Sequence, residues 1–168
     1  MTFPSGKQFI VQGASQGIGF SITEQILARD SDSIVLATCR GIPTQVEALA
    51  SLQEKYEKRL RLISLDVESE RSVETAASEA KAVVHNVDRI INVAGILHEE
   101  GLAPEKRLSD ITPSNFEKVM RVNALGALLV AKWFSPLLTK ARPCQFVNIS
   151  ARVGSISDNH LGGWYSYR

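Results

Sequence analysis

The feature that most constrains the fold of this chain is a glycine-rich segment between an apolar stretch and a helix. The segment reads Gly13-Ala14-Ser15-Gln16-Gly17-Ile18-Gly19. Residues 9–11 before it are apolar and typical of a short buried strand, while residues 20–29 after it carry apolar side chains at helical spacing. Because N–H groups at the start of a helix attract anions, this strand, turn and helix predict a site for the pyrophosphate of a dinucleotide.

The three glycines of the segment have separate predicted roles. Gly13 lets the chain turn sharply, Gly17 lets the backbone approach the phosphates, and Gly19 lets the helix pack closely on the strand. Their spacing, G-x-x-x-G-x-G, differs from the G-x-G-x-x-G of the standard dinucleotide fingerprint. A glycine-rich turn without a ligand therefore remains an alternative for the glycines taken alone.

Strands and helices alternate along the rest of the chain. Continuous apolar runs indicate a parallel sheet that is covered on both faces, and the alternation indicates βαβ units. We therefore predict one α/β domain over residues 1–168. The expected strands are residues 9–11, 33–38, 60–65, 87–93 and 145–149. The expected helices are residues 20–29, residues 45–58 with Thr44 as their cap, residues 69–84, a long helix from Thr112 or Ser114 to about Leu138, and the start of another at Tyr165.

Composition argues against several classes of partner. The net charge is +1, with 44% hydrophobic and 22% charged residues, which favours neither nucleic acid nor an acidic membrane. The most apolar stretch, residues 124–131, is too short to span a bilayer, and residues 1–6 do not resemble a secretory signal. Only two cysteines are present, Cys39 and Cys144, so we expect reduced thiols and a cytoplasmic location. His85 and His160 lack the spacing of metal ligands, His98 is expected at the surface of a loop, and no metal is expected.

Five motifs, in one order along the chain, resemble the short-chain dehydrogenase/reductase family. The resemblance covers residues 7–168 and implies a Rossmann-like doubly wound parallel sheet of strand order 3-2-1-4-5, without the family's usual last strands. The Gly-Gly-x-Tyr-x-Tyr-Arg pattern at residues 162–168 is similar to the single-domain carbonyl-reductase-like branch. The motifs are the glycine-rich loop at residues 13–19, Asp66-Val67, Asn92-Val93-Ala94-Gly95, Asn123 and Tyr167.

The resemblance implies a nicotinamide cofactor and assigns the residues that contact it. The family uses its glycine loop for the pyrophosphate and the Asp-Val pair for adenine. The implied contacts are Gly13, Ser15, Gln16, Gly17, Ile18, Gly19, Asp66, Val67, Asn92, Ala94 and Gly95. The second strand ends in Thr38-Cys39-Arg40 without the acidic residue that binds a ribose 2′-hydroxyl. Because a guanidinium suits a 2′-phosphate, Arg40 predicts a preference for NADP(H) over NAD(H), with a solvated surface charge as the alternative.

The family's chemistry implies roles for further residues. Hydride transfer to a carbonyl builds negative charge on its oxygen, so a group must donate a proton there. By resemblance, Tyr167 is this acid/base and Asn123 belongs to the proton relay. The family's catalytic serine corresponds to Ala151 here, so Ser150 or Ser155 is the candidate substitute. The implied substrate is a small carbonyl compound or alcohol, and the implied partner is a second copy bound through the helix that begins near Ser114 and ends near Leu138.

One departure from the family concerns the end of the chain. The sequence stops at Arg168, whereas the family's lysine lies four residues after its tyrosine. We therefore interpret the chain as a C-terminally incomplete reductase and expect little turnover from it alone. The alternatives are a non-catalytic nucleotide-binding form of such a reductase and another doubly wound nucleotide-binding protein, such as a flavin carrier.

Overall fold

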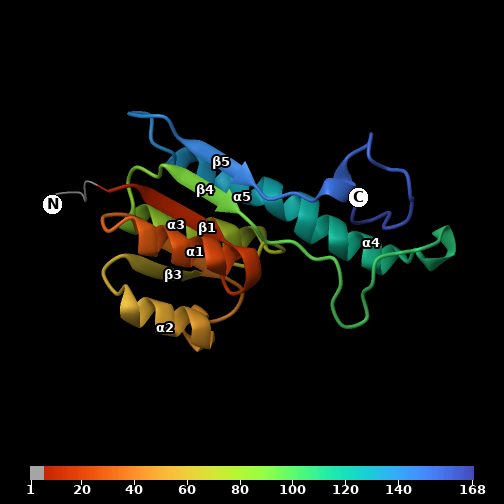
Figure 1. Cartoon of the computed structure of the whole chain (residues 1–168), viewed down its shortest axis with the longest axis horizontal. Coiled ribbons are helices and arrows are strands. Elements are labelled where there is room, and N and C mark those ends of the chain that lie inside the picture. Colours follow the sequence, from red (N-terminus) through yellow and green to blue (C-terminus); the bar gives the residue numbers. More distant parts are fainter. Residues whose placement is uncertain (1–5) are drawn as a thin grey trace.

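A sheet of five parallel strands forms the centre of the protein in the computed structural model, which describes residues 6–168 (Figure 1). The spatial order is β3-β2-β1-β4-β5, and every neighbouring pair is parallel. The predicted fold class and strand order are therefore confirmed. The strands are β1 (Gln8–Gln12), β2 (Ile34–Cys39), β3 (Leu60–Ser64), β4 (Arg89–Asn92) and β5 (Gln145–Asn148).

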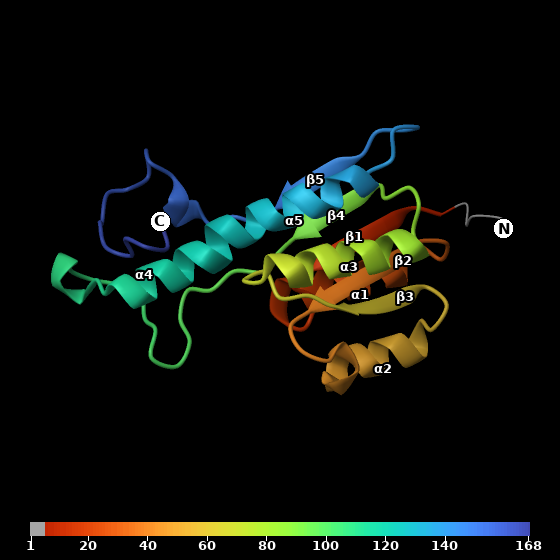
Figure 2. The ribbon, with the colours of Figure 1, turned by 180° about the vertical axis from the view of Figure 1, so that it is seen from behind.

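Helices cover both faces of this sheet, as continuous apolar strands require. Successive strand side chains point to opposite faces. On one face, Phe9 and Val11 of β1 pack in a cluster with α1 (Gly17–Arg29) and α2 (Glu47–Lys55). On the other, Ile10 packs in a cluster with α3 (Glu70–Val83) and α5 (Gly126–Phe134), the two helices in front of the sheet in Figure 2.

The helix α3 begins after a capping serine, and α1 begins at a glycine. For α3, the Ser69 side chain accepts a hydrogen bond from the Ser72 N–H at 3.3 Å, and the predicted buried stripe is present at Val73, Ala76, Ala77 and Ala80. The helix α1 begins at Gly17, three residues earlier than expected.

The predicted cap of the second helix is wrong. Thr44 lies inside a short 3₁₀ turn, Pro43–Gln45, that begins with a buried proline. The Val46 N–H closes this turn by donating to the Pro43 carbonyl, so α2 begins at Glu47 after Val46, which offers no side-chain acceptor.

The long helix of the sequence prediction is not continuous. It consists of α4 (Pro113–Met120), a π turn at Arg121–Leu125, and α5. Thr112 rather than Ser114 is the cap, because its hydroxyl accepts the Asn115 N–H at 3.3 Å. In the π turn, the Gly126 N–H donates to the carbonyl of Arg121, five residues back, which widens the helix locally.

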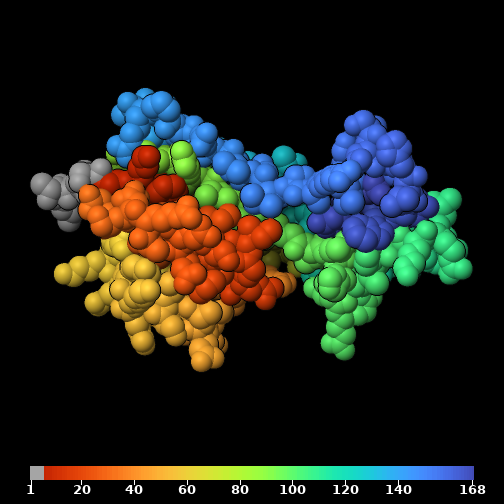
Figure 3. Space-filling model, viewed as in Figure 1, coloured from red at the N-terminus to blue at the C-terminus, as the bar shows by residue number. Residues whose placement is uncertain are grey.

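Glycine at position 126 allows α5 to pack closely on the segment after β3. A Cβ atom there would lie 2.9 Å from the Cβ of Val67. The helix α4 lies beyond the sheet. Near it, the C-terminal residues (blue) lie against the segment that precedes α4 (green) in Figure 3. Across residues 6–168, no helix combines the length and the apolar character needed to cross a bilayer.

Candidate functional site

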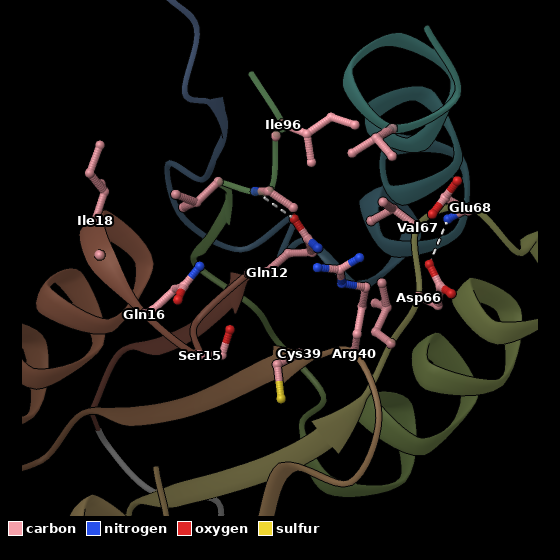
Figure 4. Close-up of a pocket in the computed structure, with 17 residues that line it drawn as sticks. Gln12, Ser15, Gln16, Ile18, Cys39, Arg40, Asp66, Val67, Glu68 and Ile96 are labelled. Carbon is pink, nitrogen blue, oxygen red and sulfur yellow. Dashed lines mark hydrogen bonds between the residues drawn. The ribbon is translucent and has the colours of Figure 1, made fainter. Parts of the chain in front are cut away.

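A cavity of about 270 Å³ lies at the carboxyl ends of β1, β2 and β4, beside the start of α1 (Figure 4). This is the position where the strand order reverses, and ligands of doubly wound sheets bind there. The lining includes ten of the predicted cofactor contacts: Gly13, Ser15, Gln16, Gly17, Ile18, Arg40, Asp66, Val67, Ala94 and Gly95.

The glycine loop shapes one wall of the cavity. Gly13 and Gly17 have φ angles of +83° and +55°, a region that side-chain-bearing residues rarely adopt. A Cβ on Gly13 would lie 2.8 Å from the Ala94 nitrogen, and one on Gly19 would lie 2.1 Å from the Gly13 carbonyl oxygen. Gly17, in contrast, has no atom within 4 Å of its Cβ position and borders open space. The predicted packing of Gly19 is therefore present, and the backbone at Gly17 is open to a ligand.

The start of α1 has no internal counter-charge. Its first turn contains no acidic residue, and Gln16 at the cap position makes no side-chain capping hydrogen bond. The first N–H groups of a helix lack partners within the helix and carry a partial positive charge. This wall can therefore accept an anion.

The opposite end of the cavity carries charged side chains. Arg40 is exposed and points from the end of β2 into the cavity, toward Gln12 (Figure 4). It forms no salt bridge within residues 6–168. Glu68, in contrast, accepts a hydrogen bond from Lys118 at 2.7 Å, and this bond raises the pKa of the lysine. Arg40 is therefore available to an anionic ligand, whereas Glu68 already has a cation.

Asp66 is held by its own backbone surroundings. Its carboxylate accepts the Glu68 N–H at 3.0 Å, and its N–H donates to the Ser72 hydroxyl at 2.9 Å. These bonds fix the turn between β3 and α3, so Asp66 and Val67 are presented at the edge of the cavity.

Several lining residues were missed from the sequence. Gln12 is the most informative, because its side-chain oxygen accepts the Ala94 N–H at 3.0 Å and so joins the ends of β1 and β4. Each missed residue lies in or next to a predicted strand end, a helix or a motif, which was the available signal. The others are Cys39, Leu65, Glu68, Val93, Ile96 and Val122.

Two asparagines of the motifs make hydrogen bonds next to the cavity without lining it. Asn92 is buried, and its amide donates to the Asn148 side chain at 2.8 Å, which ties β4 to β5. Asn123, in the π turn, makes two 2.8 Å hydrogen bonds with the backbone of Ile96. Neither residue is among those lining the cavity, and Gly19 is not among them either.

The catalytic candidates lie apart from the cavity lining. Ser150 and Ser155 are exposed, and the Ser155 hydroxyl lies 3.1 Å from that of Ser157. Tyr167 is half-buried in a single hydrogen-bonded turn, where the sequence predicted the start of a helix, and its ring is edge-on to Trp164 at a centroid distance of 6.1 Å. The structure therefore brings most predicted cofactor contacts together but does not join Tyr167, Ser150 or Ser155 to them.

Known proteins share this sequence pattern. The family model for short chain dehydrogenases matches residues 7–167. The 1-hydroxy-2-glutathionyl-2-methyl-3-butene dehydrogenase of Rhodococcus sp. (strain AD45) is 30% identical over 162 residues, which are 95% of this chain and 62% of the relative. The 3-oxoacyl-[acyl-carrier-protein] reductase FabG of Aquifex aeolicus is 29% identical over 150 residues, which are 89% of this chain and 57% of the relative.

A solved structure agrees with the fold. The NADPH-bound carbonyl reductase from chicken fatty liver superposes with a TM-score of 0.82 and 26% identity, covering 99% of this chain and 66% of the other. The present chain thus spans about three fifths of the length of the curated relatives. The match over nearly the whole chain, together with the sheet order and the glycine loop, shows that the chain belongs to the short-chain dehydrogenase family.

Proposed function

We propose that this chain binds NADP(H) in the cavity at the end of the sheet and serves the reduction of a carbonyl compound to an alcohol. The observation that carries the proposal is the open glycine turn at the uncapped start of α1, with Arg40 across the same cavity. The first accepts a pyrophosphate and the second a ribose 2′-phosphate.

The residues present fit such a cofactor. Gly17 leaves open space next to the helix amides, so a phosphate can approach the backbone there. Asp66 and Val67 lie at the edge where the adenine would be held, and Ala94 and Gly95 form the floor between β4 and Asn123. Bound NADPH would supply the hydride.

The chain's own catalytic contribution in this proposal is proton transfer. Tyr167 donates a proton to the substrate oxygen, and Asn123 holds the Ile96 backbone at the edge of the cavity. Ser150 or Ser155 takes the place of the family serine that Ala151 cannot supply. We expect slow turnover from residues 1–168 alone, because these groups do not line the cavity.

Isothermal titration calorimetry with NADPH, NADH and FMN tests the proposal. We expect heat from NADPH, weaker binding of NADH and none from FMN. An assay of NADPH oxidation with a small aldehyde then separates a reductase from a non-catalytic nucleotide-binding form. Tyr167 is not among the residues that line the cavity, which favours that second candidate. No heat from either nicotinamide cofactor would refute both.

Two further parts of the proposal concern partner and location. Apolar side chains are exposed along α4, the π turn and α5, which favours a homo-oligomer through this helix: Phe116 (41%), Met120 (41%), Leu125 (43%) and Leu128 (67%). Cys39 and Cys144 are free thiols, and such thiols persist in the reducing cytoplasm, where we place the protein.

A further inference from the structure

A buried carboxylate outside the cavity contacts the turn that carries Tyr167. Glu105, in the segment between β4 and α4, is only 3% exposed. One of its carboxylate oxygens accepts the Ser166 hydroxyl at 2.6 Å, and the other accepts the Ser166 N–H at 3.4 Å. A buried carboxylate is costly unless it is hydrogen-bonded, so this contact is a specific one.

The backbone of the same residue makes a second contact with the turn. The Trp164 N–H donates to the Glu105 carbonyl at 2.5 Å. Trp164 has a φ of +52° and is the one non-glycine residue in the left-handed region among residues 6–168. Gly163 before it also has a positive φ, and its Cβ position lies 3.1 Å from the Glu105 carbonyl oxygen. Glu105 therefore contacts the chain where its backbone is strained.

The contacted segment is a single hydrogen-bonded turn with Tyr167 inside it. The Arg168 N–H closes the turn by donating to the Trp164 carbonyl at 2.9 Å. The Ser166 N–H near the start of this turn is satisfied by the Glu105 carboxylate. Glu105, from a segment distant in the sequence, thus accepts hydrogen bonds from the N–H and hydroxyl of Ser166 in this turn.

The pKa of Glu105 agrees with this role. Burial would raise it, but hydrogen bonds from the Ser166 hydroxyl and from the N–H groups of Ser166 and Tyr165 outweigh burial, and the pKa lies below its ordinary value. The carboxylate is therefore ionised near neutral pH and is a stronger acceptor than a neutral group.

The other end of the same segment reaches the cofactor cavity. Ile96 lines the cavity, and the Asn123 side chain hydrogen-bonds to both its N–H and its carbonyl. Residues 96–105 therefore run from the cavity to the turn that carries Tyr167, the green and blue segments beside α4 in Figure 1.

We propose that Glu105 is a positioning residue, which acts through Ser166 and Trp164 to hold the Tyr167 turn at a defined place relative to the cofactor cavity. This inference rests on the proposed function, since it gives Tyr167 its role. Glu105 touches neither substrate nor cofactor in this scheme. It sets the place from which the tyrosine hydroxyl acts.

Hydrogen exchange measured by mass spectrometry on the 168-residue chain tests the contact. In Glu105→Ala, we expect the amides of Tyr165 and Ser166 to exchange at least about tenfold faster, because they lose the carboxylate that accepts from them, whereas the Trp164 N–H keeps the Glu105 backbone carbonyl. Glu105→Gln retains an acceptor oxygen and should restore most of the protection. Glu100→Ala, at an exposed glutamate of the same segment, is the matched control and should change nothing. Unchanged exchange in Glu105→Ala would overturn the proposal.

A second measurement separates positioning from general stability. NADPH should slow exchange in residues 164–168 of the unsubstituted chain and of Glu105→Gln. In Glu105→Ala it should lose this effect while its dissociation constant changes less than about twofold, since the cavity lining is intact. Equal protection by NADPH in all variants would overturn the positioning role. Absence of NADPH binding to the unsubstituted chain would refute the proposed function instead, with the exchange of the ligand-free chain still reporting on the Glu105 contact.

Discussion

The Asn123 side chain pairs with the backbone of Ile96 through two hydrogen bonds of 2.8 Å each. Its amide nitrogen donates to the Ile96 carbonyl, and its oxygen accepts the Ile96 N–H. The π turn at Arg121–Leu125 brings Asn123 to this place. One side chain thereby joins the π turn between α4 and α5 to the edge of the cavity.

Asn123→Asp is expected to weaken this joint. A carboxylate can accept the Ile96 N–H but would face the Ile96 carbonyl oxygen without a hydrogen to donate. We expect a loss of about 1–3 kcal/mol in the free energy of unfolding, measured by urea denaturation. Asn159→Asp makes the same change at an exposed residue and should cost almost nothing. Equal stability of the two variants would show that the pairing contributes little.

Arg40→Ala tests cofactor preference. If the guanidinium binds the 2′-phosphate, its removal should weaken NADPH by about tenfold or more and leave NADH nearly unchanged, as calorimetry can measure. Arg71→Ala, at an exposed arginine of α3, is the control for net charge. A parallel loss of affinity for both cofactors would remove the argument for Arg40.

Gln16→Glu tests the anion site at the start of α1. The new carboxylate would stand at the uncapped end of the helix, where it favours the free protein but repels a bound pyrophosphate. We expect about tenfold weaker NADPH binding with an unchanged or higher melting temperature. Gln25→Glu introduces the same charge farther along α1 and should bind NADPH normally. Normal binding by Gln16→Glu would place the phosphates elsewhere.

Asp88→Asn tests the ion pair of a buried carboxylate with Arg142 at the opposite end of the sheet. Hydrogen bonding to Arg142 is the main cause that holds the pKa of Asp88 below its ordinary value, with the Gln8 N–H also contributing. Because the folded-state pKa is lowered, the stabilisation is present above the unfolded-state value, which is near 3.8, and is lost as pH falls through the folded-state value. We expect Asp88→Asn to cost about 1–3 kcal/mol at neutral pH, with the difference from the unsubstituted chain shrinking in acid.

The matched control for Asp88 is an exposed pair of the same kind. Asp158 pairs with Arg152 at 2.8 Å, but the arginine side chain is 86% exposed. Asp158→Asn should therefore change the free energy of unfolding by less than about 1 kcal/mol at any pH. An equal cost at both sites would contradict the role assigned to burial.

Leu128→Glu tests the proposed contact between copies. Leu128 lies on the exposed apolar side of α5, so a carboxylate there should dissociate an oligomer that uses this helix, as sedimentation velocity would show. Leu161→Glu changes a leucine that is 96% exposed in the C-terminal loop and should leave the assembly intact. A sample that is monomeric before substitution would refute the interface.

Much of the fold and ten of the seventeen residues that line the cavity were predictable because their signals are local. Continuous apolar runs placed the strands, and helical spacing placed most helices, within a few residues. Thr44 was assigned wrongly because Pro43 closes a separate short turn there. The π turn at Arg121–Leu125 was not predicted, since the residues on either side of it have ordinary helical spacing.

The sequence by itself determined the class of sheet, the glycine turn and the edge of the sheet where the cavity lies, because a positive φ and a periodic apolar pattern are properties of neighbouring residues. Only the tertiary structure decided which distant groups meet. Gln12 joins Ala94 across 82 residues, and Glu105 reaches Ser166 across 61. Such contacts depend on how the strands and loops are placed in space, and no short-range pattern encodes that placement.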